Sequence, residues 1–369
     1  MNSTALLAPL LLAALTLDAA ETPAPRPRAM PVVSPEVQSG RRVTFRLQAP
    51  RAEEVVVTGQ WPDGRVPMTK DAQGVWTAEV GPIDAGVWEY SFQVDGLAMI
   101  DPGNPAIKPM RQPRTSILHL PGDPPLLHDL RDVPHGALHQ HTYVSKTLGR
   151  PRSMVVYTPP GYGLEPDRRY PVLYLQHGMG DNEATWTAHG KAHWIVDNLI
   201  AQGRARPMTI VMLDGHAAIG GPTAFGGNSA AFELDLIDDA MPFVEANYRV
   251  AAEAESRAIV GLSMGGEQAL RIGLTHPDRF AWIGGFSAAT PMPDAVKSAL
   301  DNAASINAHV KLLWIACGRD DFLLKRNEDF IAALKEREVR HEWLLTEGNH
   351  SWPVWRGYLG QIAPRLFQP

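Results

Sequence analysis

Residues 257–270 read RAIVGLSMGGEQAL, an apolar run that leads into a serine flanked by glycines. The uninterrupted, β-branched start of this stretch is typical of a strand buried on both faces, whereas its last residues favour a helix. Between them, GLSMG (261–265) matches the pattern G-x-S-x-G, in which glycines leave room for a tight strand-to-helix turn. Such a turn holds a serine hydroxyl above the sheet. The stretch therefore predicts an α/β fold with Ser263 as a nucleophile.

A nucleophilic serine needs a histidine base and an acid that orients the histidine, and in this arrangement the acid precedes the histidine along the chain. Residues 309–317 (HVKLLWIAC) predict a second apolar strand, which is followed by Asp320 and Asp321. A last predicted strand, 339–345, leads into a loop that carries His350. The carboxyl ends of parallel strands meet at one edge of a sheet, and open α/β sheets place their catalytic residues at this edge. We therefore predict His350 as the base and Asp321 as the acid, in preference to Asp320, because Asp321 heads the next helix.

An acyl-transfer site also needs two amide donors where negative charge develops on the tetrahedral intermediate. The first predicted donor is the backbone N–H of Met264, directly after the serine. A further strand, 171–176, runs into the sequence HGMG (177–180), whose glycines allow the backbone to turn its amides toward the serine. We predict the N–H of Met179 as the second donor.

Two tryptophans in HSWPVW directly follow the predicted histidine. Trp352 and Trp355 are therefore candidate substrate-binding residues, whose rings could stack on an aromatic acyl group or on a sugar. The alternative interpretation is that both rings pack the final helix against the sheet.

The predicted elements from residue 134 onward alternate between strands and helices. After the entry strands, the pattern indicates a helix at 186–202, a strand at 208–213, a helix at 232–247 and a strand at 281–286. Such alternation predicts a largely parallel sheet that is covered by helices on both faces.

Six stretches carry a family resemblance: HGMGDNEATW, VMLDGH, NYRV, RAIVGLSMGG, CGRDDF and GNHSWPVWR, in this order. Together they resemble the putative esterase family of α/β-hydrolases, which includes feruloyl and other carbohydrate esterases, enterochelin esterases, S-formylglutathione hydrolase and mycolyltransferases. The resemblance covers residues 134–369. It implies the same five site residues: Ser263 as nucleophile, Asp321 as acid, His350 as base, and Met179 and Met264 as oxyanion donors.

Residues 30–120 differ from the rest of the chain. RRVTFRLQAP, AEEVVVTGQW, GVWTAEV and GVWEYSFQVDG are short runs of alternating polarity between turn residues, a pattern that predicts an all-β sandwich. The order of these runs resembles an immunoglobulin-like (E-set) module, the family 48 carbohydrate-binding module. Trp61, Trp76 and Trp88 could stack on sugars or fill the core, and the module could bind sugar or shape the esterase cleft. A linker at 121–133 is expected to follow.

The N-terminal residues resemble an export signal. The apolar stretch 5–17 is too short to span a bilayer and is followed by small residues and prolines, although no Lys or Arg precedes it. We predict a signal peptide at 1–20, a proline-rich linker at 21–29, and a periplasmic or secreted protein that is not membrane-bound after signal removal. The alternative is a disordered cytosolic tail.

Composition excludes several function classes. The chain of 369 residues has a net charge of −6 and no basic block, so nucleic acid and anionic membrane surfaces are not expected partners. The single cysteine, Cys317, ends an apolar strand and is predicted to be a buried, inert thiol. His139 and His141 lack an acid or cysteine at ligand spacing, so they are interpreted as linker histidines, and no metal or cofactor is expected.

These observations predict a secreted serine esterase that hydrolyses carboxylic esters through an acyl-enzyme, with feruloyl or acetyl esters of plant polysaccharide as the leading substrates. One alternative is a siderophore esterase or an acyltransferase of the same fold. Another is a carbohydrate-binding protein whose hydrolase domain is inactive. The oligomeric state is not predicted.

Overall fold

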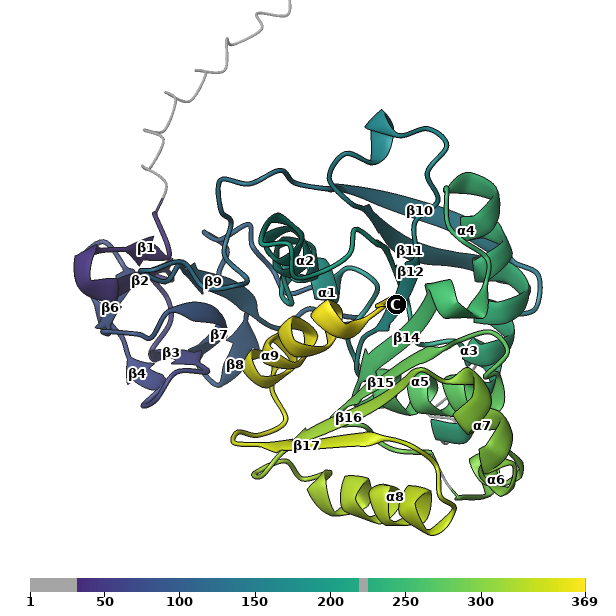
Figure 1. Ribbon diagram of the computed structural model, residues 1–369. Helices are drawn as coiled ribbons and strands as arrows, with labels where there is room; N and C mark the ends of the chain where they lie inside the picture. The colour runs from purple at the N-terminus through teal and green to yellow at the C-terminus, as the bar shows by residue number, and fades with distance from the viewer. Residues whose placement is uncertain (1–31, 219–224, 292, 369) are drawn as a thin grey trace, which may run out of the picture.

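The structure is a computed structural model that describes residues 32–218, 225–291 and 293–368. The predicted signal peptide and proline-rich linker lie outside the described residues. A small all-β part is followed by a larger α/β part with a mostly parallel sheet (Figure 1). The predicted fold class, an α/β-hydrolase domain preceded by an immunoglobulin-like sandwich, is confirmed.

The N-terminal module, residues 32–120, consists of two antiparallel sheets. One has the strand order β1-β2-β6-β5, and the other has the order β4-β3-β7-β8, with β9 also pairing with β7. The strands are β1 Glu36–Val37, β2 Val43–Gln48, β3 Val55–Gly59, β4 Arg65–Pro67, β5 Thr69–Lys70, β6 Val75–Val80, β7 Gly86–Val94, β8 Leu97–Met99 and β9 Ser116–Leu120. Trp61 and Trp76 are buried in the core between the sheets, whereas Trp88 is only partly buried against it. Two of the three tryptophans therefore fill the core.

The hydrolase domain is built on an eight-stranded sheet of order β10-β11-β13-β12-β14-β15-β16-β17. β10 is antiparallel to β11, and β11 is antiparallel to β13. The remaining strands, β12 to β17, are parallel to one another. The strands are β10 Ala137–Ser145, β11 Arg150–Thr158, β12 Val172–Gln176, β13 Thr209–Leu213, β14 Arg257–Leu262, β15 Trp282–Phe286, β16 Leu312–Gly318 and β17 Glu342–Thr346. The chain leaves β12 toward β13 but leaves β14 toward β15. The carboxyl ends of β12 and β14 therefore border a topological switch point, where open α/β sheets bind ligands.

Helices cover both faces of this sheet (Figure 1). They are α1 Thr185–Ala188, α2 Ala192–Ala201, α3 Phe225–Leu234, α4 Met241–Asn247, α5 Met264–Thr275, α6 Pro293–Asp301, α7 Ala303–His309, α8 Leu324–Glu336 and α9 Trp352–Ile362. None of the helices in the described parts of the chain is long and apolar enough to cross a membrane.

The bounds of several predicted elements differ from the structure, among them the last strand, which is expected at 339–345 and spans Glu342–Thr346. The helix expected at 186–202 is split into α1 and α2, because Lys191 has a left-handed φ of 57°. The helix expected at 232–247 begins earlier, with α3, and passes through a π-helical segment at Asp235–Ala240 before α4. The strand expected from His309 begins at Leu312, because His309 still belongs to α7.

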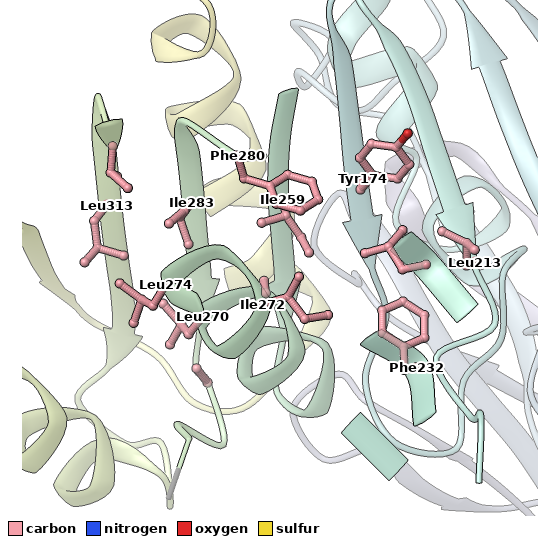
Figure 2. Packing of buried hydrophobic residues seen from close by; sticks show 14 of the residues in the cluster. Tyr174, Leu213, Phe232, Ile259, Leu270, Ile272, Leu274, Phe280, Ile283 and Leu313 are labelled. Atoms are coloured by element: carbon pink, nitrogen blue, oxygen red, sulfur yellow. The ribbon is translucent and has the colours of Figure 1, made fainter. Parts of the chain in front are cut away.

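Alternate residues of the central strands point into two apolar cores, one on each face of the sheet. Tyr174 and Ile259 lie on the face covered by α5, in the same apolar cluster as Leu270 and Ile272 of that helix (Figure 2). Their neighbour Val260 points to the opposite face, which α1, α2 and α9 cover. Burial on both faces explains the uninterrupted apolar strands and fixes the strand ends that carry the site.

Candidate active site

Ser263 lies in the turn between β14 and α5 in an unusual backbone conformation, with φ 52° and ψ −115°. A Cβ atom on Gly261 would lie 2.2 Å from the carbonyl oxygen of Gly265, and one on Gly265 would lie 2.4 Å from the carbonyl oxygen of His177. Both distances are shorter than any tolerable contact, so only glycine fits. The strained turn exposes the serine side chain above the sheet, as in a nucleophile elbow.

The structure brings the predicted serine, histidine and acid into one hydrogen-bonded chain. Nε2 of His350 lies 3.0 Å from Oγ of Ser263. Nδ1 of the same imidazole lies 2.9 Å and 3.0 Å from the two carboxylate oxygens of Asp321. With the proton on Nδ1 donated to Asp321, Nε2 is left to accept the proton of the serine hydroxyl. The arrangement can therefore activate Ser263 as a nucleophile.

Asp321, and not its neighbour Asp320, faces the histidine. The side chain of Asp321 is buried and also accepts a hydrogen bond of 2.8 Å from the backbone N–H of Leu323. Burial by itself would raise the pKa of Asp321, but interactions with His350, Ser287 and the backbone of Leu323 outweigh burial and hold this pKa below its ordinary value. Asp320 is exposed to solvent. The geometry agrees with the preference for Asp321.

Residues 177–181, here called the oxyanion loop, follow β12 and run beside the serine turn. A Cβ atom on Gly178 would lie 2.7 Å from Cδ1 of Leu262 and 3.4 Å from Cβ of Ser263. Nε2 of His177 accepts a hydrogen bond from the N–H of Gly215, so its Nδ1 carries the proton and donates to the carbonyl oxygen of Gly178 at 2.8 Å. The glycine therefore permits close approach of the loop to the nucleophile.

The direction of the Met179 amide follows from how the preceding carbonyl is held. The carbonyl oxygen of Gly178 accepts hydrogen bonds from Nδ1 of His177 and from the N–H of Asp181, the latter at 3.3 Å. In a trans peptide unit the C=O and N–H groups point in opposite directions. The N–H of Met179 consequently points away from these two donors. This orientation and the nearness of Gly178 to Ser263 support Met179, together with Met264 at the start of α5, as oxyanion donors.

A second histidine supports the same loop. Nε2 of His216, in the segment after β13, accepts a hydrogen bond of 3.1 Å from the N–H of Gly180. Burial lowers the pKa of His216 to about 4, so the imidazole is neutral and can accept this bond at ordinary pH. These roles of His177 and His216 were not predicted from the sequence. The available signal was their shared position, since each follows a parallel strand at the catalytic edge.

Trp352 and Trp355, the predicted substrate-binding residues, are both buried, with 3% and 6% of their surface exposed. The ring of Trp352 packs edge-on against Trp186 at 5.0 Å. The ring of Trp355 meets the imidazole of His350 edge-on at 4.9 Å between centroids. Such burial leaves little ring surface for stacking on a ligand. Contact with substrate stays a prediction for both, while packing of α9 and of the histidine is what their geometry provides.

An aromatic side chain that is open to solvent beside the predicted base is Phe322, a position that was not predicted from the sequence. Phe322 is 76% exposed, and its ring centroid lies 4.5 Å from that of His350. Its position directly after the acid in CGRDDF was the available signal. Because an exposed ring beside the base can contact a bound ester, Phe322 is a better candidate for stacking than either tryptophan.

Two further predictions concern residues outside the triad. Cys317 is buried and free, and burial raises the pKa of its thiol to about 12, as expected of an inert cysteine. The interpretation of His139 and His141 as linker histidines is wrong, because both lie within β10. In the described residues, no group of three or more His, Cys, Asp or Glu side chains is arranged to hold a metal ion.

Both parts of the chain are similar to known protein families. A family model described as putative esterase matches residues 145–366, and one described as carbohydrate-binding module 48 (isoamylase N-terminal domain) matches residues 32–108. The chain is 35% identical over 346 residues to an endo-1,4-beta-xylanase/feruloyl esterase of Xylanibacter ruminicola, covering 90% of this chain and 46% of that protein. The chain thus spans about half the length of that relative.

Solved structures show the same architecture. A ferulic acid esterase structure is 29% identical, with a TM-score of 0.57, and the match covers 63% of this chain and 98% of that one. The enterobactin esterase of Shigella flexneri is 20% identical, with a TM-score of 0.63, over 89% of this chain and 93% of that one, and shows similarity of fold. The fold and the arrangement of the site are those of the α/β-hydrolase esterase class. The chain belongs to the putative esterase family.

Proposed function

We propose that the protein is a serine esterase that hydrolyses feruloyl or acetyl esters of plant polysaccharide through an acyl-enzyme. The observation that carries the proposal is the hydrogen-bonded chain from Ser263 through His350 to Asp321. An inactive hydrolase domain would have no need to keep these three polar side chains in this geometry, with the serine in a strained backbone conformation. The chain of contacts therefore favours an enzyme over a binding protein.

The proposed reaction has two matching halves. Oγ of Ser263 attacks the ester carbonyl carbon while its proton passes to Nε2 of His350, and the resulting oxyanion accepts hydrogen bonds from the backbone N–H groups of Met264 and Met179. Collapse of this intermediate breaks the bond between the carbonyl carbon and the alcohol oxygen. The alcohol oxygen takes the proton from His350 and departs, and the acyl group stays bound to Ser263. Water then attacks with His350 as base, and the acid leaves as Oγ recovers its proton. Asp321 keeps the imidazole in the required tautomer throughout.

The choice of ester is supported by the relatives and by the side chains at the site. The relative from Xylanibacter ruminicola is named a xylanase/feruloyl esterase, and a structural neighbour is a ferulic acid esterase. In this chain, the exposed ring of Phe322 lies beside the proposed base, His350. An aromatic acid could stack on this ring, whereas a polar acyl group would gain less from it.

Export to the periplasm or the medium is part of the same proposal, because a polymeric plant ester cannot enter a cell. It rests on the apolar stretch 5–17 and the small residues after it. Sequencing the N-terminus of protein recovered from the periplasm and medium of an expressing culture tests it. A chain that stays in the cytosol and begins at its original N-terminus would contradict it.

The proposal is tested with the purified full chain against p-nitrophenyl acetate, methyl ferulate and a catecholate siderophore ester. We expect cleavage of the first two, and we expect Ser263→Ala to reduce turnover by roughly a million-fold without changing the melting temperature appreciably, since it removes one exposed oxygen. More than a few percent of activity in the Ser263→Ala protein would contradict the mechanism. Cleavage of the siderophore ester alone would agree with the mechanism but would show that the substrate is a siderophore ester and not a plant polysaccharide ester.

A further inference from the structure

A segment of the N-terminal module lies directly against the oxyanion loop. The backbone N–H of Arg111 donates to the carbonyl oxygen of Gly180 at 2.9 Å, and Met110 forms a β-bridge with Asp181. Oγ1 of Thr185, at the start of α1, donates to the carbonyl oxygen of Pro109 at 2.7 Å. Three consecutive residues before the end of the module therefore contact the loop or the helix that follows it.

A buried ion triad joins the two domains at the same place. The side chain of Lys108 is 8% exposed, and its Nζ lies 3.1 Å from Oε1 of Glu89 and 3.2 Å from Oδ1 of Asp181. Glu89 belongs to β7 of the module, whereas Asp181 ends the oxyanion loop. Lys108 is also 5.8 Å from the ring centroid of Trp352. Because two carboxylates and one ammonium are desolvated together, removing the ammonium would leave the buried carboxylate of Asp181 without its ion-pair partner.

Asp181 connects this triad to the proposed oxyanion donor. Its carboxylate forms an ion pair with Lys108. Its backbone N–H donates to the carbonyl oxygen of Gly178, which belongs to the same peptide unit as the N–H of Met179. Burial raises the pKa of the Asp181 carboxyl, and the ammonium of Lys108 opposes that rise. A displaced or protonated Asp181 would therefore loosen the loop on the side that faces the module, although His177 and His216 still support it.

A further contact fixes the module against the hydrolase domain. The guanidinium of Arg356, on α9, is buried and donates to the carbonyl oxygen of Val87 in β7 at 2.9 Å and to that of His189 at 3.1 Å. The strand that carries Glu89 is thus held by the same helix that begins after the catalytic histidine. The module has a defined position relative to the triad, which a flexibly tethered binding module would not need.

We propose that Lys108 is a positioning residue of the esterase site, which holds the oxyanion loop through Asp181 so that the N–H of Met179 faces the developing oxyanion. The proposal rests on the proposed function. It makes the N-terminal module a structural part of the catalytic site. Displacing a reacting or stabilising group by about 1 Å can cost on the order of a hundredfold in rate, so the contribution is measurable.

The test compares Lys108→Met with the wild-type full chain. For p-nitrophenyl acetate we expect kcat to fall by about 10- to 100-fold and KM to change less than about threefold, because the oxyanion forms after binding. Inhibition by phenylboronic acid, whose tetrahedral serine adduct places an oxygen at the oxyanion position, should weaken by a similar factor. Asp181→Asn should show the same pattern and serves as the second variant if Lys108→Met does not fold.

Lys70→Met is the matched control, since Lys70 is another module lysine, whose contacts with the Trp76 ring and the carbonyl oxygen of Ala52 lie within the module. It should leave kcat and boronate inhibition unchanged. A folded Lys108→Met protein with kcat and inhibition within twofold of wild type would overturn the proposal, as would a rise in KM alone. A wild-type protein that cleaves no ester would instead contradict the proposed function, so the two failures are distinguishable.

Discussion

Asp320 and Asp321 are adjacent carboxylates with different surroundings, and the difference predicts their effects on turnover. Asp321→Asn should lower kcat by roughly four orders of magnitude, because an amide in this place favours the wrong tautomer of His350. Asp320→Asn, at the exposed neighbouring position, is the matched control and should lose less than about tenfold. Steady-state kinetics with p-nitrophenyl acetate measures both. If Asp320→Asn lowered kcat more than Asp321→Asn, Asp320 would be the acid that orients His350.

Phe322 is the residue whose removal should alter the choice of acyl group. The exposed ring lies beside His350, where an aromatic acid of a bound ester can stack on it. Loss of an aromatic pair worth about 0.5–1.5 kcal/mol corresponds to roughly two- to tenfold in specificity. Phe322→Ala should therefore lower kcat/KM for methyl ferulate by this factor and leave that for p-nitrophenyl acetate nearly unchanged. An equal fall for both esters would argue for a general effect on the histidine.

At the scale of elements, the turn from β14 to α5 depends on close backbone approach. Gly265→Ala would place a Cβ 2.4 Å from the carbonyl oxygen of His177, so the start of α5 or the end of β12 must move. We expect a loss of about 1–3 kcal/mol in the free energy of unfolding, together with a large loss of kcat, because both predicted oxyanion donors lie at this contact. Urea denaturation and steady-state kinetics measure the two effects.

Gly357 provides the control for that substitution. It lies in α9, and a Cβ there would meet no atom within 4 Å. Gly357→Ala should therefore be neutral or raise the free energy of unfolding by about 0.5–1 kcal/mol, with kcat unchanged. If Gly265→Ala behaved like Gly357→Ala, the close approach of the two elements would not matter for function.

At the scale of the whole molecule, histidines that are wholly or partly buried make stability depend on pH. Burial lowers the pKa of His193 and His216 to about 4, and that of His189 well below its ordinary value. In the unfolded chain these groups bind protons near pH 6.5. Their contribution is therefore fully present above pH 6.5 and is lost as the pH falls toward 4, by up to about 1.4 kcal/mol per pH unit for each proton.

We accordingly expect the melting temperature to fall steadily between pH 7 and pH 5, as followed by calorimetry. His193 lies in α2 away from the triad. In the His193→Gln protein, unfolding should take up about one proton fewer, so the melting temperature should fall less steeply with decreasing pH. A melting temperature that is constant over this range would contradict the burial of neutral histidines.

Much of the site was predictable from local sequence. The nucleophile turn, the order of acid and histidine, and the end of β12 each depend on short patterns of glycine and on apolar runs, which constrain the backbone wherever they occur. Element bounds were less predictable. Lys191 has a left-handed conformation between α1 and α2, and His309 is the last residue of α7, and the pattern of apolar residues marks neither boundary.

The sequence by itself determined the strand-to-helix turn at Ser263, the succession of strands that brings Asp321 and His350 to the same edge, and the separate all-β character of residues 30–120. Only the tertiary structure decided that Trp352 is enclosed while Phe322 is open, and that Lys108 reaches Asp181 across the domain boundary. The physical reason is that backbone geometry follows from nearby residues, whereas exposure and ion pairing depend on which surfaces meet after folding. Glu89, Lys108 and Asp181 are far apart in the chain and acquire a common role only where the two domains pack.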